Sequence, residues 1–277
     1  MYPGKCREIA RYRATDAPLT PSQADACKGC IQIPVMLGTT AILYNVPGVT
    51  KQIRMTGKIL AGIYLGSISK WNDAALTAIN PDAGLPDLKI TPAYRSDGSG
   101  TSYNFTDFLT SVSPDWSSKV GKSTQPAFPA GVGARGSSGV AGIVTSTPGA
   151  IGYADVAYAV KNKIRFAAVK NKHGDFATPG IRAGAAAAST VTSVPADNAI
   201  SIVNPPASDK TKIAYPISTF VWVIVPQTSS KAKLIKQFLL FAISNQGQAL
   251  GRPLLYPPMP KIVQIASAKT IAKITQG

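Results

Sequence analysis

The chain has 277 residues, of which 45% are hydrophobic, and it carries a formal net charge of +16. This length allows a large buried core in one or two domains. No apolar run reaches the roughly 18 residues that a membrane-spanning helix needs. The 29 basic residues are scattered, without the basic blocks or interleaved aromatics typical of nucleic-acid-binding proteins. A net positive charge generally favours anionic partners such as nucleic acid, anionic lipid or small oxyanions. Because the basic residues are scattered, we interpret them as a solvated basic surface.

The cysteines and the histidine do not form a metal-binding pattern. Cys27 and Cys30 have CxxC spacing, but no second pair follows, and the one histidine, His173, is distant in sequence. We therefore expect no metal site. If the protein is exported, we expect one disulfide, either between Cys27 and Cys30 or between Cys6 and one of them, and one remaining thiol.

The first elements along the chain alternate between helix and strand. Thr20 is expected to cap a short helix over 20–26, with proline at its first position. The apolar run 31–44 predicts two buried strand segments bent at Gly38. Helical spacing follows over 56–63 and 71–79.

A strand is then predicted over 90–94, and it leads into a glycine-broken turn and a helix. The turn contains Gly98 and Gly100, which let a backbone approach a ligand closely. Ser99 and Thr101 add hydroxyl donors. A helix N-terminus exposes unpaired N–H groups and a partial positive charge, so this stretch is a candidate oxyanion site.

Two charged residues just upstream strengthen this interpretation. Arg95 at the strand end offers a planar fork of donors for two oxygens, and Asp97 can hold the guanidinium in place. The alternative is an ordinary N-cap and turn, because Ser, Thr and Asp are common at helix starts. The density of donors favours the anion site.

The rest of the chain continues the alternation without repeats. A glycine-rich stretch over 131–139 satisfies GxGxxG, but it follows no clear apolar strand, so a dinucleotide site is not favoured. The other predicted elements are helices over 138–146, 183–188, 231–243 and 261–274, and strands over 150–153, 164–169 and 220–225. In the helix 231–243, Leu234, Phe238 and Phe241 share one face, and the aromatic residues are expected to be core. Three more apolar residues lie beside this face: Ile235, Leu239 and Ala242. Strands alternating with helices predict an α/β architecture.

Four segments in order give this chain a resemblance to a known family. They are RSDGSGTSYNFTDFL from Arg95, TDAPL from Thr15, IPVMLGTTAILYNVPGV from Ile33, and GVGARGSSGVAGIVTSTPGAIGYADVAYA from Gly131. Together they resemble the phosphate-binding proteins that serve bacterial phosphate ABC importers, over nearly the whole chain.

The resemblance implies a two-lobe periplasmic-binding-protein (Venus-flytrap) fold. By that analogy the first lobe comprises residues 1–40 and 221–277, the second comprises 41–220, and the chain crosses between them near 37–44 and 216–221. The family also has an export signal, a first strand and two binding loops before the TDAPL segment. The first lobe is therefore expected to be incomplete and phosphate binding to be weak.

The resemblance also implies a set of phosphate ligands. Arg95, Ser99, Gly100 and Thr101 would bind from the second lobe and Asp16 from the first, with Asp97 orienting Arg95. A carboxylate at Asp16 can accept a hydrogen bond from a protonated phosphate but repels sulfate, which carries no proton. Otherwise, Asp16 is an ordinary turn residue before a proline.

Two other function classes were weighed. A phosphate-ester-processing enzyme needs a nucleophile with a base, or a metal cluster, and neither pattern is present, so we expect no catalytic residues. A basic nucleic-acid- or membrane-surface-binding protein rests on the net charge alone. The resemblance instead implies a periplasmic monomer that uses no cofactor, does not bind nucleic acid and delivers phosphate to the permease subunits of a phosphate ABC transporter.

Overall fold

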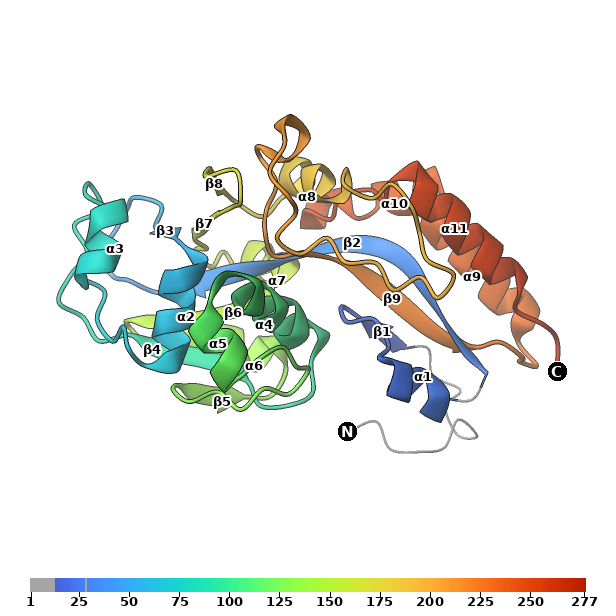
Figure 1. Cartoon of the computed structure of the whole chain (residues 1–277), viewed down its shortest axis with the longest axis horizontal. Helices are drawn as coiled ribbons and strands as arrows, with labels where there is room; N and C mark the ends of the chain where they lie inside the picture. The colour runs from blue at the N-terminus through green and yellow to red at the C-terminus, as the bar shows by residue number, and fades with distance from the viewer. Residues whose placement is uncertain (1–12, 28) are drawn as a thin grey trace.

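The computed structural model describes residues 13–27 and 29–277, so Cys6 lies outside the described residues. A six-stranded sheet runs through the molecule in the order β1-β9-β2-β6-β4-β5 (Figure 1). Its strands are β1 (Arg13–Thr15), β2 (Cys30–Tyr44), β4 (Thr91–Arg95), β5 (Val132–Ala134), β6 (Ala150–Asp155) and β9 (Ser218–Pro226). Helices pack beside both ends of this sheet, which confirms the predicted α/β class.

The long strand β2 connects two hydrophobic cores. Its residues 30–39 pair with β9, and its residues 40–44 pair with β6, both antiparallel. The prediction of two strand segments is wrong, because β2 is one strand that continues through Gly38. The register shift falls between Pro34 and Met36 instead, where the proline has no N–H to donate to the ladder.

One core, made of two hydrophobic clusters, is built on β4, β6 and the second half of β2, and we call this body the second lobe. Its largest buried side chains are aromatic: Tyr64, Trp71, Phe105, Phe108, Trp116 and Tyr153. Its helices are α2 (Gly57–Leu65), α3 (Ala74–Ile79), α4 (Gly100–Val112), α5 (Pro114–Lys119), α6 (Gly136–Ser146) and α7 (Val156–Lys161). A small sheet of β3 (Arg54–Met55), β7 (Ala168–Lys170) and β8 (Phe176–Ala177) completes it.

The other core is built on β9 and the first half of β2, and we call this body the first lobe. Its helices are α1 (Pro21–Ala26), α9 (Ala232–Ile243), α10 (Asn245–Ala249) and α11 (Lys261–Ala272). Thr20 caps α1 with Pro21 at its first turn, as the sequence predicted. A disulfide joins Cys27 to Cys30 and so links the end of α1 to the start of β2.

The segment between β8 and β9 contacts both cores. It contains α8 (Ile181–Ala188) and the short helix η1 (Asp209–Thr211). Residues 186–188, Ile200 and Ile202 belong to the first-lobe core, whereas Tyr215 and Ile217 belong to the second-lobe core. The predicted lobe boundaries, which assign 41–220 to the second lobe, stay a prediction. Because of these contacts, we propose that residues 186–202 move with the first lobe.

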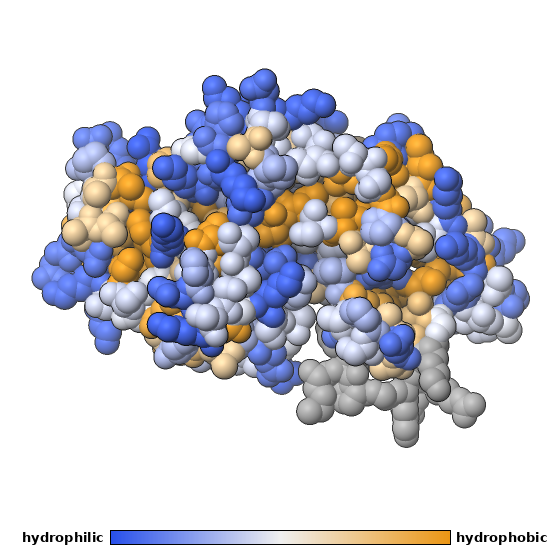
Figure 2. All heavy atoms as spheres, viewed as in Figure 1, coloured by the Kyte–Doolittle hydropathy of each residue, from blue (hydrophilic) through white to orange (hydrophobic). Residues whose placement is uncertain are grey.

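The predicted core face of α9 is wrong. Leu234 and Phe238 are 61% and 59% exposed, and Phe241 is 48% exposed, whereas Ile235 and Leu239 are buried against the sheet. Figure 2 shows hydrophobic side chains at the surface on the side where Figure 1 places α9, α10 and α11. Among the described residues, no helix is long and apolar enough to cross a membrane.

Candidate anion-binding site

The N-terminus of α4 is the centre of the candidate site. Ser99 caps the helix, and its hydroxyl oxygen accepts a hydrogen bond from the N–H of Ser102 at 3.2 Å. The N–H groups of Gly100 and Thr101 occupy the first two helical positions, so the helix itself offers them no acceptor. Ser99 and Thr101 are nearly fully buried. The sequence thus places two backbone donors and two hydroxyls at the positive end of a 13-residue helix.

Arg95 stands at the end of β4 beside this helix start. Its Nε and one terminal nitrogen donate to the two carboxylate oxygens of Asp97, at 2.7 and 2.6 Å. These hydrogen bonds hold the pKa of Asp97 well below its usual range and raise the pKa of Arg95. The bidentate pair fixes the plane of the guanidinium, and both terminal nitrogens keep an N–H that Asp97 does not use.

The N-terminus of α6 supports the same pair. The N–H of Gly136 donates to Asp97 at 3.0 Å, and the other terminal nitrogen of Arg95 donates to the Ser137 hydroxyl at 3.2 Å. Sequence analysis missed Ser137, because its contact with Arg95 depends on the order of the strands in the sheet. β4 and β5 are parallel neighbours, each followed by a helix, and the helices after parallel strands begin at the same edge of a sheet.

A buried tyrosine lies beneath the site. The hydroxyl of Tyr153 accepts a hydrogen bond from the N–H of Arg95 at 3.2 Å and shares one with the Ser102 hydroxyl at 2.7 Å. Burial raises the pKa of Tyr153 to about 12, so this hydroxyl stays neutral. Tyr153 therefore connects the end of β4 to the first turn of α4.

Asp16 reaches the site from the first lobe. Its carboxylate accepts a hydrogen bond from the Thr101 hydroxyl at 2.7 Å, and its backbone carbonyl accepts one from the Thr219 hydroxyl at 3.0 Å. Burial raises the pKa of Asp16, while the Thr101 hydrogen bond and the charge of Arg95 oppose the rise. A side chain at Gly100 would place its Cβ 2.4 Å from the Asp16 nitrogen, so only glycine permits this approach.

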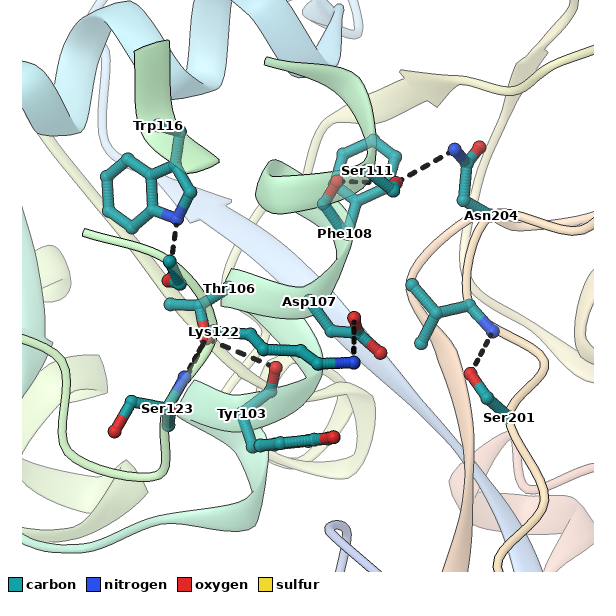
Figure 3. Close-up of polar contacts among 12 residues, drawn as sticks. Tyr103, Thr106, Asp107, Phe108, Ser111, Trp116, Lys122, Ser123, Ser201 and Asn204 are labelled. Atoms are coloured by element: carbon teal, nitrogen blue, oxygen red, sulfur yellow. Dashed lines mark hydrogen bonds and ion pairs between the residues drawn. The ribbon is translucent and has the colours of Figure 1, made fainter. Parts of the chain in front are cut away.

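The body of α4 is fixed by contacts away from the site (Figure 3). The Thr106 hydroxyl accepts from the N–H of Ser123 at 3.1 Å, and Asp107 pairs with Lys122 at 3.1 Å. Farther along the helix, the side-chain amide of Asn204 donates to the Ser111 hydroxyl at 2.9 Å. These contacts anchor the helix, so its N-terminus is held in place.

The geometry brings all six sequence-predicted residues to one place. Neutral donors and one arginine suit an oxyanion, and the single carboxylate of Asp16 suits one that still carries a proton. Within residues 13–27 and 29–277, no group of three or more His, Cys, Asp and Glu side chains is placed to hold a metal.

The chain is similar to known proteins over most of its length. Residues 7–246 match the family described as "PBP superfamily domain". The phosphate-binding protein PstS of Xylella fastidiosa is 37% identical over 90% of this chain and 68% of its own length. PstS of Pasteurella multocida is 31% identical over 96% of this chain and 78% of its own.

A solved structure agrees in fold. A high-affinity periplasmic phosphate-binding protein, PfluDING, bound with phosphate, superposes with a TM-score of 0.75 at 21% identity, over 97% of this chain and 80% of that one. At this identity the likeness establishes the two-lobe fold.

Proposed function

Because the chain belongs to the PBP superfamily and, within it, to the PstS phosphate-binding proteins, we propose that it binds inorganic phosphate between its lobes. One observation carries the proposal. The Asp16 carboxylate from one lobe and the Arg95 guanidinium with the α4 N-terminus from the other converge on one point. The named relatives are binding proteins, which confirms the expectation of a binding protein instead of an enzyme.

Each ligand role follows from the chemistry of its group. The backbone N–H groups of Gly100 and Thr101 and the hydroxyl of Ser99 donate to phosphate oxygens. Arg95 donates the N–H bonds that Asp97 leaves free. Asp16 accepts the hydrogen bond from the proton that phosphate retains near neutral pH.

The relatives also support a cellular role. We infer that the protein is a periplasmic monomer that presents phosphate to the membrane permease of an ABC importer, and that it does not bind nucleic acid. The net charge of +16 then raises the local concentration of the anion by long-range attraction.

Titration calorimetry with sodium phosphate tests the binding proposal. We expect saturable binding of one phosphate per chain and a rise in melting temperature with phosphate concentration. Asp107→Asn is a suitable control, because Asp107 pairs with Lys122 and takes no part in the site. Absence of both the heat of binding and the thermal shift would contradict the proposal.

A further inference from the structure

A loop of the first lobe reaches across to the second lobe beside the candidate site. The loop follows α10 and contains the short helix η2 (Arg252–Leu254) and Tyr256. On its far side, Met259 and Val263 are part of the first-lobe core. Leu255 instead packs against the core formed by β6, α6 and α7 of the second lobe.

The backbone of this loop is held in an unusual conformation. Leu255 has a φ of +61°, in the left-handed region that a branched residue occupies only at a cost in energy. Pro257, two residues further on, packs closely against Gly184 of α8. A Cβ added at Gly184 would lie 2.5 Å from the proline ring. Such a conformation persists only where surrounding contacts fix it.

The fixed conformation delivers Tyr256 to a carboxylate. The Tyr256 hydroxyl donates to Asp155 at 2.6 Å, and the N–H of Ala157 donates to the same oxygen at 2.9 Å. Asp155 ends β6 and caps α7 in the second lobe. The hydrogen bond therefore joins the two lobes directly.

The titratable groups around this contact are few. Asp155 interacts with the charge of Asp16 in the site, and Tyr256 interacts with Asp155, Asp16 and Tyr158 of α7. Burial raises the pKa of Asp155 to about 6, and the Tyr256 and Ala157 hydrogen bonds only partly offset the rise. Burial also raises the pKa of Tyr256 well above its ordinary value, so Tyr256 remains a donor.

We propose that Tyr256 and Asp155 form a hydrogen-bonded latch that holds the lobes closed, and that protonation of Asp155 favours the closed form by removing a buried charge. An ionised carboxylate is costly where it is buried and close to Asp16, and opening the lobes returns it to water. The closed form therefore binds the proton more tightly than the open form. Closure is most favoured below the ordinary carboxyl pKa of 3.8, and this contribution is lost progressively as the pH rises from there through about 6.

Small-angle X-ray scattering of the ligand-free protein tests the latch without reference to any ligand. We expect the radius of gyration of the wild-type protein to increase between pH 5 and pH 8. Asp155→Asn should show a clearly smaller increase, because the amide keeps an acceptor for Tyr256 and does not ionise, whereas the buried Asp16 still contributes to the pH response. Tyr256→Phe should be more open at both pH values, whereas Tyr158→Phe, which removes a neighbouring hydroxyl, should match the wild type. Equal pH responses of the wild type and Asp155→Asn would overturn the proposal.

The effect on affinity rests on the proposed phosphate binding and is measured separately. Tyr256→Phe should weaken phosphate binding about tenfold, the effect of one lost hydrogen bond to a charged group. The ratio of the wild-type to the Asp155→Asn dissociation constant should rise about tenfold between pH 5 and pH 8, and taking the ratio cancels the ionisation of phosphate itself. A constant ratio would contradict the pH role of Asp155. Absence of phosphate binding in the wild type would instead contradict the proposed function and leave the scattering result to decide on the latch.

Discussion

The second lobe supplies the candidate site with Arg95 and the N-terminus of α4, whereas the first lobe supplies the Asp16 carboxylate from a loop beside β1. On the second lobe, Arg95 is held by hydrogen bonds to Asp97 and Ser137. These bonds lie within one lobe and do not depend on closure. Asp16, in contrast, makes its hydrogen bond to Thr101 across the gap between the lobes. We therefore propose that the second lobe is preorganised to hold the anion and that the first lobe selects it on closing.

Among the changes that test this comparison of the lobes, removal of Arg95 should weaken phosphate binding most. Arg95→Ala deletes about two charge-assisted hydrogen bonds and leaves Asp97 unpaired near the anion, so phosphate binding should weaken by at least about 100-fold. Titration calorimetry measures the change, and Arg182→Ala, an exposed arginine on α8, serves as the control. An unchanged dissociation constant for Arg95→Ala would place the anion elsewhere.

A side chain at Gly100 should separate the two lobes without altering the preorganised donors. Because its Cβ would lie 2.4 Å from the Asp16 backbone, Gly100→Ala should hinder closure and weaken binding by about 30-fold, the equivalent of roughly 2 kcal/mol. Gly98→Ala is the matched control, since a Cβ there meets no atom within 4 Å. Similar affinities for the two variants would show that closure onto Asp16 is dispensable.

Loss of the charge that orients Arg95 should have a smaller effect. Asp97→Asn keeps the side-chain shape but replaces a bidentate ion pair by a single neutral acceptor, so we expect phosphate to bind about tenfold more weakly. The variant Ser137→Ala removes one hydrogen bond from the guanidinium to a neutral acceptor and should cost less than Asp97→Asn, which removes a bidentate ion pair. If Ser137→Ala were the more damaging variant, Ser137 would be a direct ligand rather than a support for Arg95.

The smallest effect is expected for a substitution on the exposed face of α9, where the free energy of unfolding should hardly change. Phe238→Gln changes a mostly exposed side chain and should alter the free energy of unfolding by less than about 0.5 kcal/mol. The adjacent Leu239→Ala empties a buried position and should cost about 2–4 kcal/mol. Chemical denaturation distinguishes the two. A large loss in Phe238→Gln would restore the sequence-based prediction that this aromatic face is core.

These outcomes separate what the sequence could predict from what it could not. The stretch from Arg95 to Thr101 was predictable because its residues lie within one strand, one turn and one helix start. Ser137 and Tyr153 act on Arg95 from 42 and 58 residues away, so only the strand order places them there. The loop that carries Tyr256 also depends on tertiary contacts, because a left-handed leucine has no signature in sequence.

The error at α9 has a different physical cause. The helix is apolar on more than one side, with Leu234 and Phe238 on one face and Ile235 and Leu239 on another. Periodicity shows that a helix is amphipathic but does not decide between two apolar faces. In the structure, Ile235 and Leu239 pack in the first-lobe core, whereas Leu234 and Phe238 are exposed.

Selectivity between phosphate and sulfate is the most direct test of the central claim that Asp16 accepts the proton of the bound anion. Calorimetric titration at pH 8 with each anion, on the wild type and on Asp16→Asn, gives the four dissociation constants required. We predict that the wild type prefers phosphate by at least about 100-fold, and that Asp16→Asn lowers this preference at least tenfold, chiefly by gaining affinity for sulfate as the repulsive carboxylate is removed. Equal affinities of the wild type for the two anions, or an unchanged preference in Asp16→Asn, would contradict the account.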